Sequence, residues 1–235
     1  MERPDLVLTS PASRMDNHYR PPLSLMYVAG YYQNKGLKVK ILDFPFKNVV
    51  RTTKFLNSRS TMVDTINQKI VTEIVRLNPK TIGLSCYSPE LEEVKHLISE
   101  IKKYTNIPIL VGGIHPTLYP KDFEGISDMI CQGRCDNGSP TYNLLDMSYY
   151  SSANPYAVRG VFLRCAYILS SFGCPSSCTF CVAPTLRRFY GVVQLKTPEE
   201  LFKEVNYVKE TYKIDGFYFI DDLFTIDKKR ILEFT

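Results

Sequence analysis

Short apolar runs alternate with amphipathic helical patterns along the first 135 residues of this 235-residue chain. This alternation constrains the fold more than any other feature, because strands joined by single helices must run parallel in one sheet. Strands are expected at 5–10, 37–43, 81–86, 107–113 and 128–133. The pattern predicts an α/β domain over 1–135, with a doubly wound, Rossmann-like parallel sheet covered on both faces.

The intervening helices have local signals of their own. A helix is expected over 23–34, with Gly36 placed for a left-handed C-terminal cap. A second is expected over 61–77, where isoleucines recur every four residues. Ser88 and Pro89 are expected to start a third, as N-cap and first helical residue.

The rhythm breaks after residue 135. Turn-forming residues fill 136–160, which is therefore interpreted as a linker. A second unit over 161–235 begins with a strand expected at 165–171. Thr197 and Glu200 then form a capping box before a helix, a strand follows at 216–221, and Asp227 begins a last helix. These are the first strand–helix units of a partial β/α (TIM-like) barrel.

Composition excludes several classes of protein. With 44% hydrophobic and 23% charged residues, the chain is globular, and no apolar run is long enough to cross a membrane. The net charge of +5 is scattered, so no nucleic-acid partner is expected. No secretory signal is present, which favours the cytoplasm and argues against a disulfide framework. Four of the seven cysteines lie in or beside apolar segments, and most of them are expected to be small buried residues: Cys86, Cys131, Cys135 and Cys165.

The other three cysteines, Cys174, Cys178 and Cys181, lie within eight residues of one another. Thiolates at this spacing can each bind one iron of a [4Fe–4S] cluster and leave the fourth iron open to a small molecule. A zinc site is the alternative, but it would want a fourth ligand, and no Cys or His follows Cys181. The spacing therefore favours the cluster.

This loop, with Phe180 before the last cysteine, resembles the signature of the radical S-adenosylmethionine superfamily. The resemblance implies that the open iron chelates S-adenosylmethionine, whose reductive cleavage releases a 5′-deoxyadenosyl radical. It also implies that Phe180 packs near the adenine and that Asp221 or Asp222 receives the ammonium group. A cap for the next helix is the other interpretation of this pair. Arg187 and Arg188 could meet a carboxylate, but such arginines are more often surface residues.

The front domain resembles the cobalamin-binding domain that precedes many radical S-adenosylmethionine domains. The resemblance rests on residues 20–32 and 111–117, and it implies cobalamin near Ser85, Gly112 and Gly113. Ordinary turns of a doubly wound fold would also explain the two glycines. Asp16 and His18 partly match a cobalt-ligand motif that here lacks its glycine.

Two histidines and one arginine of the front domain also carry expectations. His115 is expected beside the cofactor pocket, and His96 on the surface of its helix. Arg134 reverses the charge that the family carries after the fifth strand, where the chain also looks internally shortened.

The predicted function is radical S-adenosylmethionine chemistry with cobalamin as second cofactor. The reaction expected is methyl transfer to an unactivated carbon of a small molecule, with a ring rearrangement or another radical reaction as the alternative. An electron donor such as flavodoxin or ferredoxin would reduce the cluster. The barrel stops after two units where the family has about six, so the chain is expected to be a fragment, a truncated product or half of an assembly. The alternatives are a truncated, non-catalytic cofactor-binding module and a zinc-stabilised interaction protein.

Overall fold

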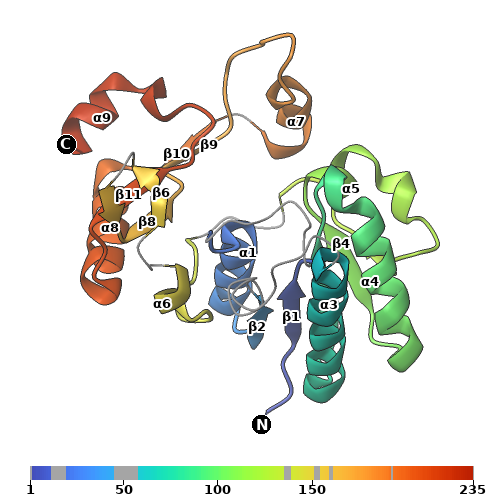
Figure 1. Cartoon of the computed structure of the whole chain (residues 1–235). Helices are drawn as coiled ribbons and strands as arrows, with labels where there is room; N and C mark the ends of the chain where they lie inside the picture. The colour runs from blue at the N-terminus through green and yellow to red at the C-terminus, as the bar shows by residue number, and fades with distance from the viewer. Residues whose placement is uncertain are drawn as a thin grey trace. The chain divides into compact units, whose positions relative to one another are not determined.

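The computed structural model describes residues 2–11, 20–44, 58–134, 139–150, 154–158, 161–191 and 193–234. The chain divides into two compact units. One comprises Met1–His18 with Pro22–Leu145, and the other comprises Tyr19–Pro21 with Asp146–Thr235. Figure 1 shows the helices and strands of both units.

The first unit is built on a five-stranded sheet in the order β2-β1-β3-β4-β5. All four strand pairs are parallel, which confirms the predicted sheet. Its strands are β1 (Leu6–Thr9), β2 (Val39–Leu42), β3 (Thr81–Ser85), β4 (Ile109–Gly112) and β5 (Met129–Ile130). Its helices are α1 (Leu23–Asn34), α3 (Ser58–Leu77), η1 (Ser88–Glu90), α4 (Leu91–Tyr104), α5 (Ile114–Leu118) and η2 (Pro120–Phe123).

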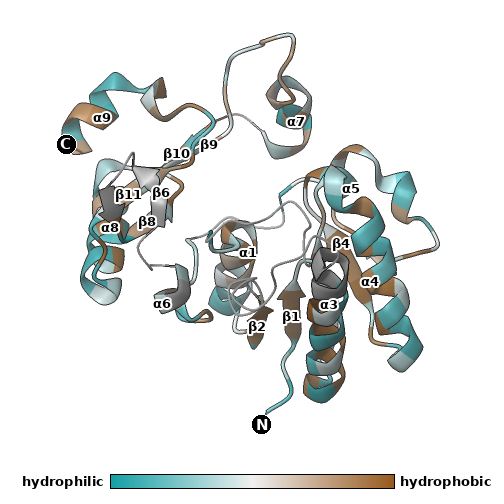
Figure 2. Ribbon diagram, viewed as in Figure 1, coloured by the Kyte–Doolittle hydropathy of each residue, from teal (hydrophilic) through white to brown (hydrophobic). Residues whose placement is uncertain are grey.

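The sheet is covered on both faces, as the alternation of strands and helices predicts. Figure 1 shows α1 on one side of β1 and β2, with α3 and α4 on the opposite side. The isoleucines of α3 at 66, 70 and 74 are buried, as is the stripe of α4 formed by Val94, Leu97, Ile98 and Ile101. These side chains share one apolar core with Phe123 of η2. In Figure 2 the strands β1 and β2 are brown, and α3 and α4 carry both brown and teal residues.

Ser88 is not the N-cap that the sequence predicts for α4. A 3-10 turn, η1, includes Ser88 and Pro89, and α4 begins only at Leu91. The Ser88 hydroxyl lies 3.0 Å from Nδ1 of His115, a residue from another part of the chain. The Ser88 hydroxyl, which the local pattern assigned to capping, is therefore used in a tertiary contact with His115.

The second unit contains short sheets rather than one continuous sheet. Strands β8 (Cys165–Ile168) and β11 (Gly216–Phe219) pair in parallel, and β9 (Ser171–Phe172) pairs antiparallel with β10 (Gln194–Leu195). Helices α7 (Ala183–Tyr190), α8 (Pro198–Tyr212), η3 (Phe224–Ile226) and α9 (Lys228–Phe234) complete this part. The Thr197 capping box at α8 is present as predicted. Helix α7 and the β9–β10 pair were not predicted.

The stretch predicted as a linker contains regular structure. Helix α6 (Met147–Tyr150) and strand β6 (Asn154–Val158) fall within it, and β6 pairs antiparallel with β7 (Val161–Leu163). Across the part of the chain that the structure describes, no helix combines the length and apolar character needed to span a membrane.

Candidate functional site

The cysteine-rich loop connects β9 to α7 in the second unit. Gly173 opens it with a φ of +86°, a left-handed conformation that a side chain would strain. Cys174 is half-buried, whereas Cys178 and Cys181 are exposed, and all three are free thiols. The loop thus presents three unpaired sulfur donors directly after β9.

Helix α7 contacts both ends of this loop. The backbone N–H of Ala183 donates to Sγ of Cys181 at 3.4 Å. Arg187 Nη2 donates to the carbonyl oxygens of Cys174 at 3.0 Å and Ser176 at 2.7 Å. Arg187 is therefore half-buried and bonded to backbone carbonyl oxygens, and among the described residues no carboxylate binds it, in contrast to both expectations.

The three sulfur atoms do not form a ready metal site. Among the described residues, no three His, Cys, Asp or Glu side chains lie close enough together to hold a metal ion. Phe180, between the second and third cysteines, is 92% exposed. The donor set, three free thiols on one loop, fits an iron–sulfur cluster, but the loop would have to change shape to bring the sulfurs together.

Asp221 lies just beyond the carboxyl end of β11, and its carboxylate is held by two serines. Oδ1 accepts hydrogen bonds from the Ser170 hydroxyl at 2.8 Å and the Ser171 hydroxyl at 2.5 Å. Oδ2 is buried and has no hydrogen-bond partner in the described structure. A buried carboxylate oxygen without a donor fits a cationic ligand group such as an ammonium.

The capping interpretation of Asp221 and Asp222 is wrong. Oδ1 of Asp227 accepts the backbone N–H of Arg230 at 3.0 Å, so Asp227 caps α9. Asp222 is exposed, which makes Asp221 the better ligand candidate of the two. This distinction was not visible in the sequence.

Sequence reasoning missed the partners of Asp221. Arg230, only 5% exposed, donates from both Nη1 and Nη2 to the hydroxyl of Ser170, which itself donates to Asp221. The paired serines after β8 were a signal, since polar residues at the carboxyl end of a parallel strand commonly face ligands. Nothing in the sequence pointed to Arg230.

In the first unit, Ser85 and Gly112 end neighbouring strands and face each other in the β3–β4 register. Gly113 follows with a φ of +107°. A Cβ at Gly113 would lie 2.8 Å from the carbonyl oxygen of Cys86, whereas one at Gly112 would meet nothing closer than Cβ of Cys131 at 3.6 Å. Gly113 is thus required by its close contact with protein backbone, whereas a side chain at Gly112 would make only an ordinary contact with Cys131.

His115 is buried and joins two other segments through hydrogen bonds, whereas the sequence predicts a loop residue beside the cofactor pocket. It lies on α5 and is 6% exposed. Nδ1 lies 3.0 Å from the Ser88 hydroxyl and Nε2 lies 3.0 Å from Oδ2 of Asp122. With both ring nitrogens engaged, His115 has no nitrogen left for a metal. His96 is exposed as predicted, and Asp16 and His18 lie outside the described residues.

The other cysteines differ from the three in the loop. Cys86 and Cys165 are buried free thiols, as predicted. Burial, with a smaller contribution from Glu90, raises the pKa of Cys86 to about 12. Cys131 is disulfide-bonded and half-buried, so it is not one of the small buried thiols that the sequence predicts for most of this group.

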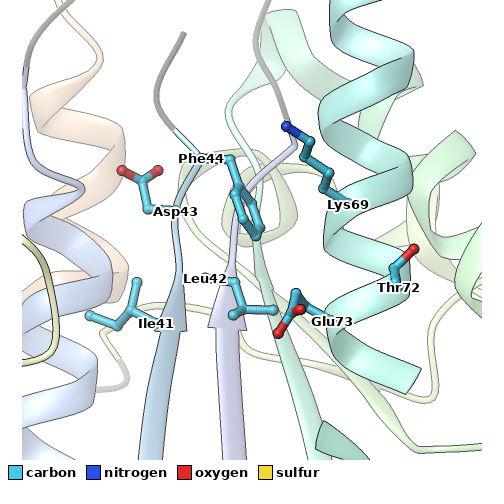
Figure 3. Close-up of a pocket in the computed structure, with 7 residues that line it drawn as sticks. All are labelled: Ile41, Leu42, Asp43, Phe44, Lys69, Thr72 and Glu73. Carbon is cyan, nitrogen blue, oxygen red and sulfur yellow. The ribbon is translucent and has the colours of Figure 1, made fainter. Parts of the chain in front are cut away.

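A hollow of about 450 Å³ lies beside the carboxyl end of β2. Figure 3 shows the ring of Phe44 between this strand and α3, with Lys69 extending from the helix. The hollow belongs to the same edge of the sheet as Ser85 and Gly112, since all the strands are parallel. None of the residues predicted to bind a cofactor lines it.

Comparisons with known proteins give one match to the front of the chain and others to nearly all of it. The family model described as B12 binding domain matches residues 17–140. The uncharacterized methyltransferase PH0819 of Pyrococcus horikoshii is 22% identical over 265 residues, covering 91% of this chain and 51% of that protein.

Two solved structures share the fold. The radical S-adenosylmethionine methyltransferase TsrM of Kitasatospora setae, with cobalamin and a [4Fe–4S] cluster bound, matches with a TM-score of 0.64 and 16% identity, over 99% of this chain and 51% of its own. The cobalamin-dependent S-adenosylmethionine radical enzyme OxsB matches with a TM-score of 0.67 and 18% identity, over 99% of this chain and 36% of its own. The chain thus spans about half the length, or less, of the proteins it resembles.

Proposed function

Because the chain belongs to the B12-binding domain family, we propose that its first unit binds cobalamin and its second unit binds a [4Fe–4S] cluster with S-adenosylmethionine. The reaction proposed is cobalamin-dependent methyl transfer to a carbon of a small molecule. The observation that carries the proposal is the loop of three free thiols between β9 and α7, in a chain whose first unit has the B12-binding fold.

Each cofactor has candidate residues in this chain. Cys174, Cys178 and Cys181 would ligate the cluster, and a bound cluster supplies the electron that cleaves S-adenosylmethionine. Asp221 would hold the ammonium group of S-adenosylmethionine through its buried Oδ2, with Ser170 and Ser171 fixing the other carboxylate oxygen.

The remaining assignments are less specific. Phe180 is proposed to cover the adenine, because an exposed aromatic ring beside the cluster ligands can stack on a base. Gly112, with Ser85 on the next strand, would let cobalamin approach the sheet edge. A small reductase of the flavodoxin or ferredoxin type is the proposed electron donor.

Electron paramagnetic resonance tests the proposal directly. The chain would be purified without oxygen, reconstituted with iron and sulfide, reduced, and measured with and without S-adenosylmethionine. We expect a [4Fe–4S] signal that shifts when S-adenosylmethionine is added and that is lost in Cys178→Ala. Cys86→Ala is the matched control, since it removes a buried thiol outside the loop and should leave the signal unchanged. Zinc uptake in place of iron would contradict the proposal.

A second candidate is a cofactor-binding module without turnover. It is favoured because the chain matches only 51% of TsrM and 36% of OxsB. The same experiment separates the two functions. A cluster signal that does not respond to S-adenosylmethionine, together with cobalamin binding, would support the module and exclude catalysis by this polypeptide.

A further inference from the structure

Arg187 and Arg188 are neighbours on α7, but their surroundings differ. Arg187 points back to the cysteine loop, where Nη2 donates to the carbonyl oxygens of Cys174 at 3.0 Å and Ser176 at 2.7 Å. Arg188 is exposed. The sequence places two identical side chains side by side, and the structure gives only one of them a role in the loop.

The hydrogen bonds from Arg187 satisfy backbone carbonyl groups of the cysteine loop. Residues 173–178 form neither helix nor strand, so their carbonyl groups need partners outside regular structure. Arg187 supplies one at the beginning of the loop, and the N–H of Ala183 contacts Cys181 at its end. Helix α7 therefore holds both ends of the loop, while the exposed Cys178 lies between them.

The guanidinium group of Arg187 also has unused hydrogen-bonding capacity. Its Nε is buried and has no hydrogen-bond partner in the described part of the chain. A buried N–H of a charged group is seldom left without an acceptor. Its charge lies beside the first cysteine of the loop, where a cluster held by three thiolates would add negative charge.

We propose that Arg187 is a positioning residue for the cluster: it fixes the Cys174 end of the loop and stabilises the negative charge of the bound cluster. The inference rests on the proposed function, since it assigns a role toward the same cluster. Hydrogen bonds and charge near the sulfur atoms set the reduction potential of such clusters. Arg187 therefore affects both the retention and the potential of the cluster.

The test compares the reconstituted wild-type chain with Arg187→Met, Arg187→Lys and Arg188→Met. The rate of iron loss to a ferrous chelator and the midpoint potential are measured without oxygen. Arg187→Met should lose iron at least about tenfold faster than Arg188→Met, because two charge-assisted hydrogen bonds are removed. Its potential should be more negative, since reduction adds negative charge that the guanidinium no longer offsets. Arg187→Lys should keep a potential close to wild type but still lose iron faster, because lysine keeps the charge without the planar fork.

Amide hydrogen exchange of the cluster-free chain gives a second readout that needs no cofactor. Peptides covering 173–178 should exchange faster in Arg187→Met than in Arg188→Met, with the exchange of β8 unchanged as a control for folding. Equal iron loss and equal exchange in these two variants would overturn the inference while leaving the proposed function intact. Failure of the wild-type chain to take up iron would instead overturn the proposed function, and the exchange data would still decide whether Arg187 holds the loop.

Discussion

The hydroxyl of Ser170 donates to Oδ1 of Asp221 at 2.8 Å, across 51 residues of sequence. The same hydroxyl accepts hydrogen bonds from the guanidinium of Arg230. A buried cation is thus connected to the carboxylate through one serine. The arrangement fixes Asp221 at the carboxyl end of β11 while its Oδ2 is left for a ligand.

Asp221→Asn should weaken the binding of S-adenosylmethionine to the cluster-loaded chain by at least about tenfold, because the serines hold Oδ1 and the oxygen left for the ammonium is replaced by an NH2 group that cannot accept a hydrogen bond. Equilibrium dialysis measures the affinity. Asp222→Asn is the matched control and should bind normally, since that side chain is exposed. Thermal unfolding should show no loss of stability in Asp221→Asn, because the replaced oxygen has no partner in the described structure. Equal affinities of the two variants would remove Asp221 from the site.

The free thiols should separate into two classes when the reduced, cluster-free chain is labelled with iodoacetamide. Cys178 and Cys181 are exposed and should react first. Burial raises the pKa of Cys86 to about 12, so at pH 8 only about one in ten thousand Cys86 side chains is the reactive thiolate. Burial also raises the pKa of Cys165.

Raising the pH from 7 to 9 should leave Cys86 protected, since its thiolate population stays small below a pKa of about 12. Peptide mass spectrometry measures each site. Labelling in denaturant is the control, where Cys86 should react like the others. Native-state labelling of Cys86 at the rate of Cys181 would contradict the structure.

His115→Gln should lower the free energy of unfolding by about 1–3 kcal/mol, because the buried imidazole bridges Ser88 and Asp122 and glutamine cannot meet both. Urea unfolding followed by far-ultraviolet circular dichroism measures the loss. His96→Gln removes an exposed histidine of α4 and should stay within about 0.5 kcal/mol of wild type. Equal losses in the two variants would mean that the bridge contributes nothing.

Local sequence signals predicted those elements whose stabilising contacts join residues close together in the chain. The capping box of Thr197 and Glu200 starts α8 where expected, because both of its hydrogen bonds join residues three apart. Ser88 had an equally good local signal, yet its hydroxyl contacts His115, 27 residues away. Helix α7 is short, at eight residues, and Val182 before it provides no side-chain cap, so its start has no capping signal.

The candidate site divides in the same way. The three cysteines lie within eight residues of one another, so their shared role could be predicted from the sequence. The support of Asp221 by Ser170, and of Ser170 by Arg230, joins segments 51 and 60 residues apart. Such contacts follow from the pairing of β8 with β11 and from the placement of α9, so no local pattern contains them.

Gly113→Ala should destabilise the first unit far more than Gly125→Ala. Both glycines have a positive φ, +107° and +73°, so alanine is strained at each by about 1–3 kcal/mol. At Gly113 the new Cβ would also lie 2.8 Å from the carbonyl oxygen of Cys86, whereas nothing lies within 4 Å at Gly125. Overpacking should add about 1–3 kcal/mol at Gly113 alone, measurable by urea unfolding. Similar losses in the two variants would show that the Cys86 backbone can move aside.

Gly112→Ala should fold normally and bind cobalamin more weakly, which separates a role in binding from a role in folding. Gly112 does not have the positive φ of Gly113, and its added Cβ would meet Cys131 at an ordinary 3.6 Å. Stability should therefore change little. If the corrin or its nucleotide tail approaches the backbone at the end of β4, the added methyl group clashes with it. A spectrophotometric titration with hydroxocobalamin should then show a dissociation constant raised at least about tenfold, as expected when overpacking costs more than about 1.4 kcal/mol. Gly125→Ala should bind like wild type. Unchanged affinity in Gly112→Ala would place cobalamin away from the β3–β4 edge.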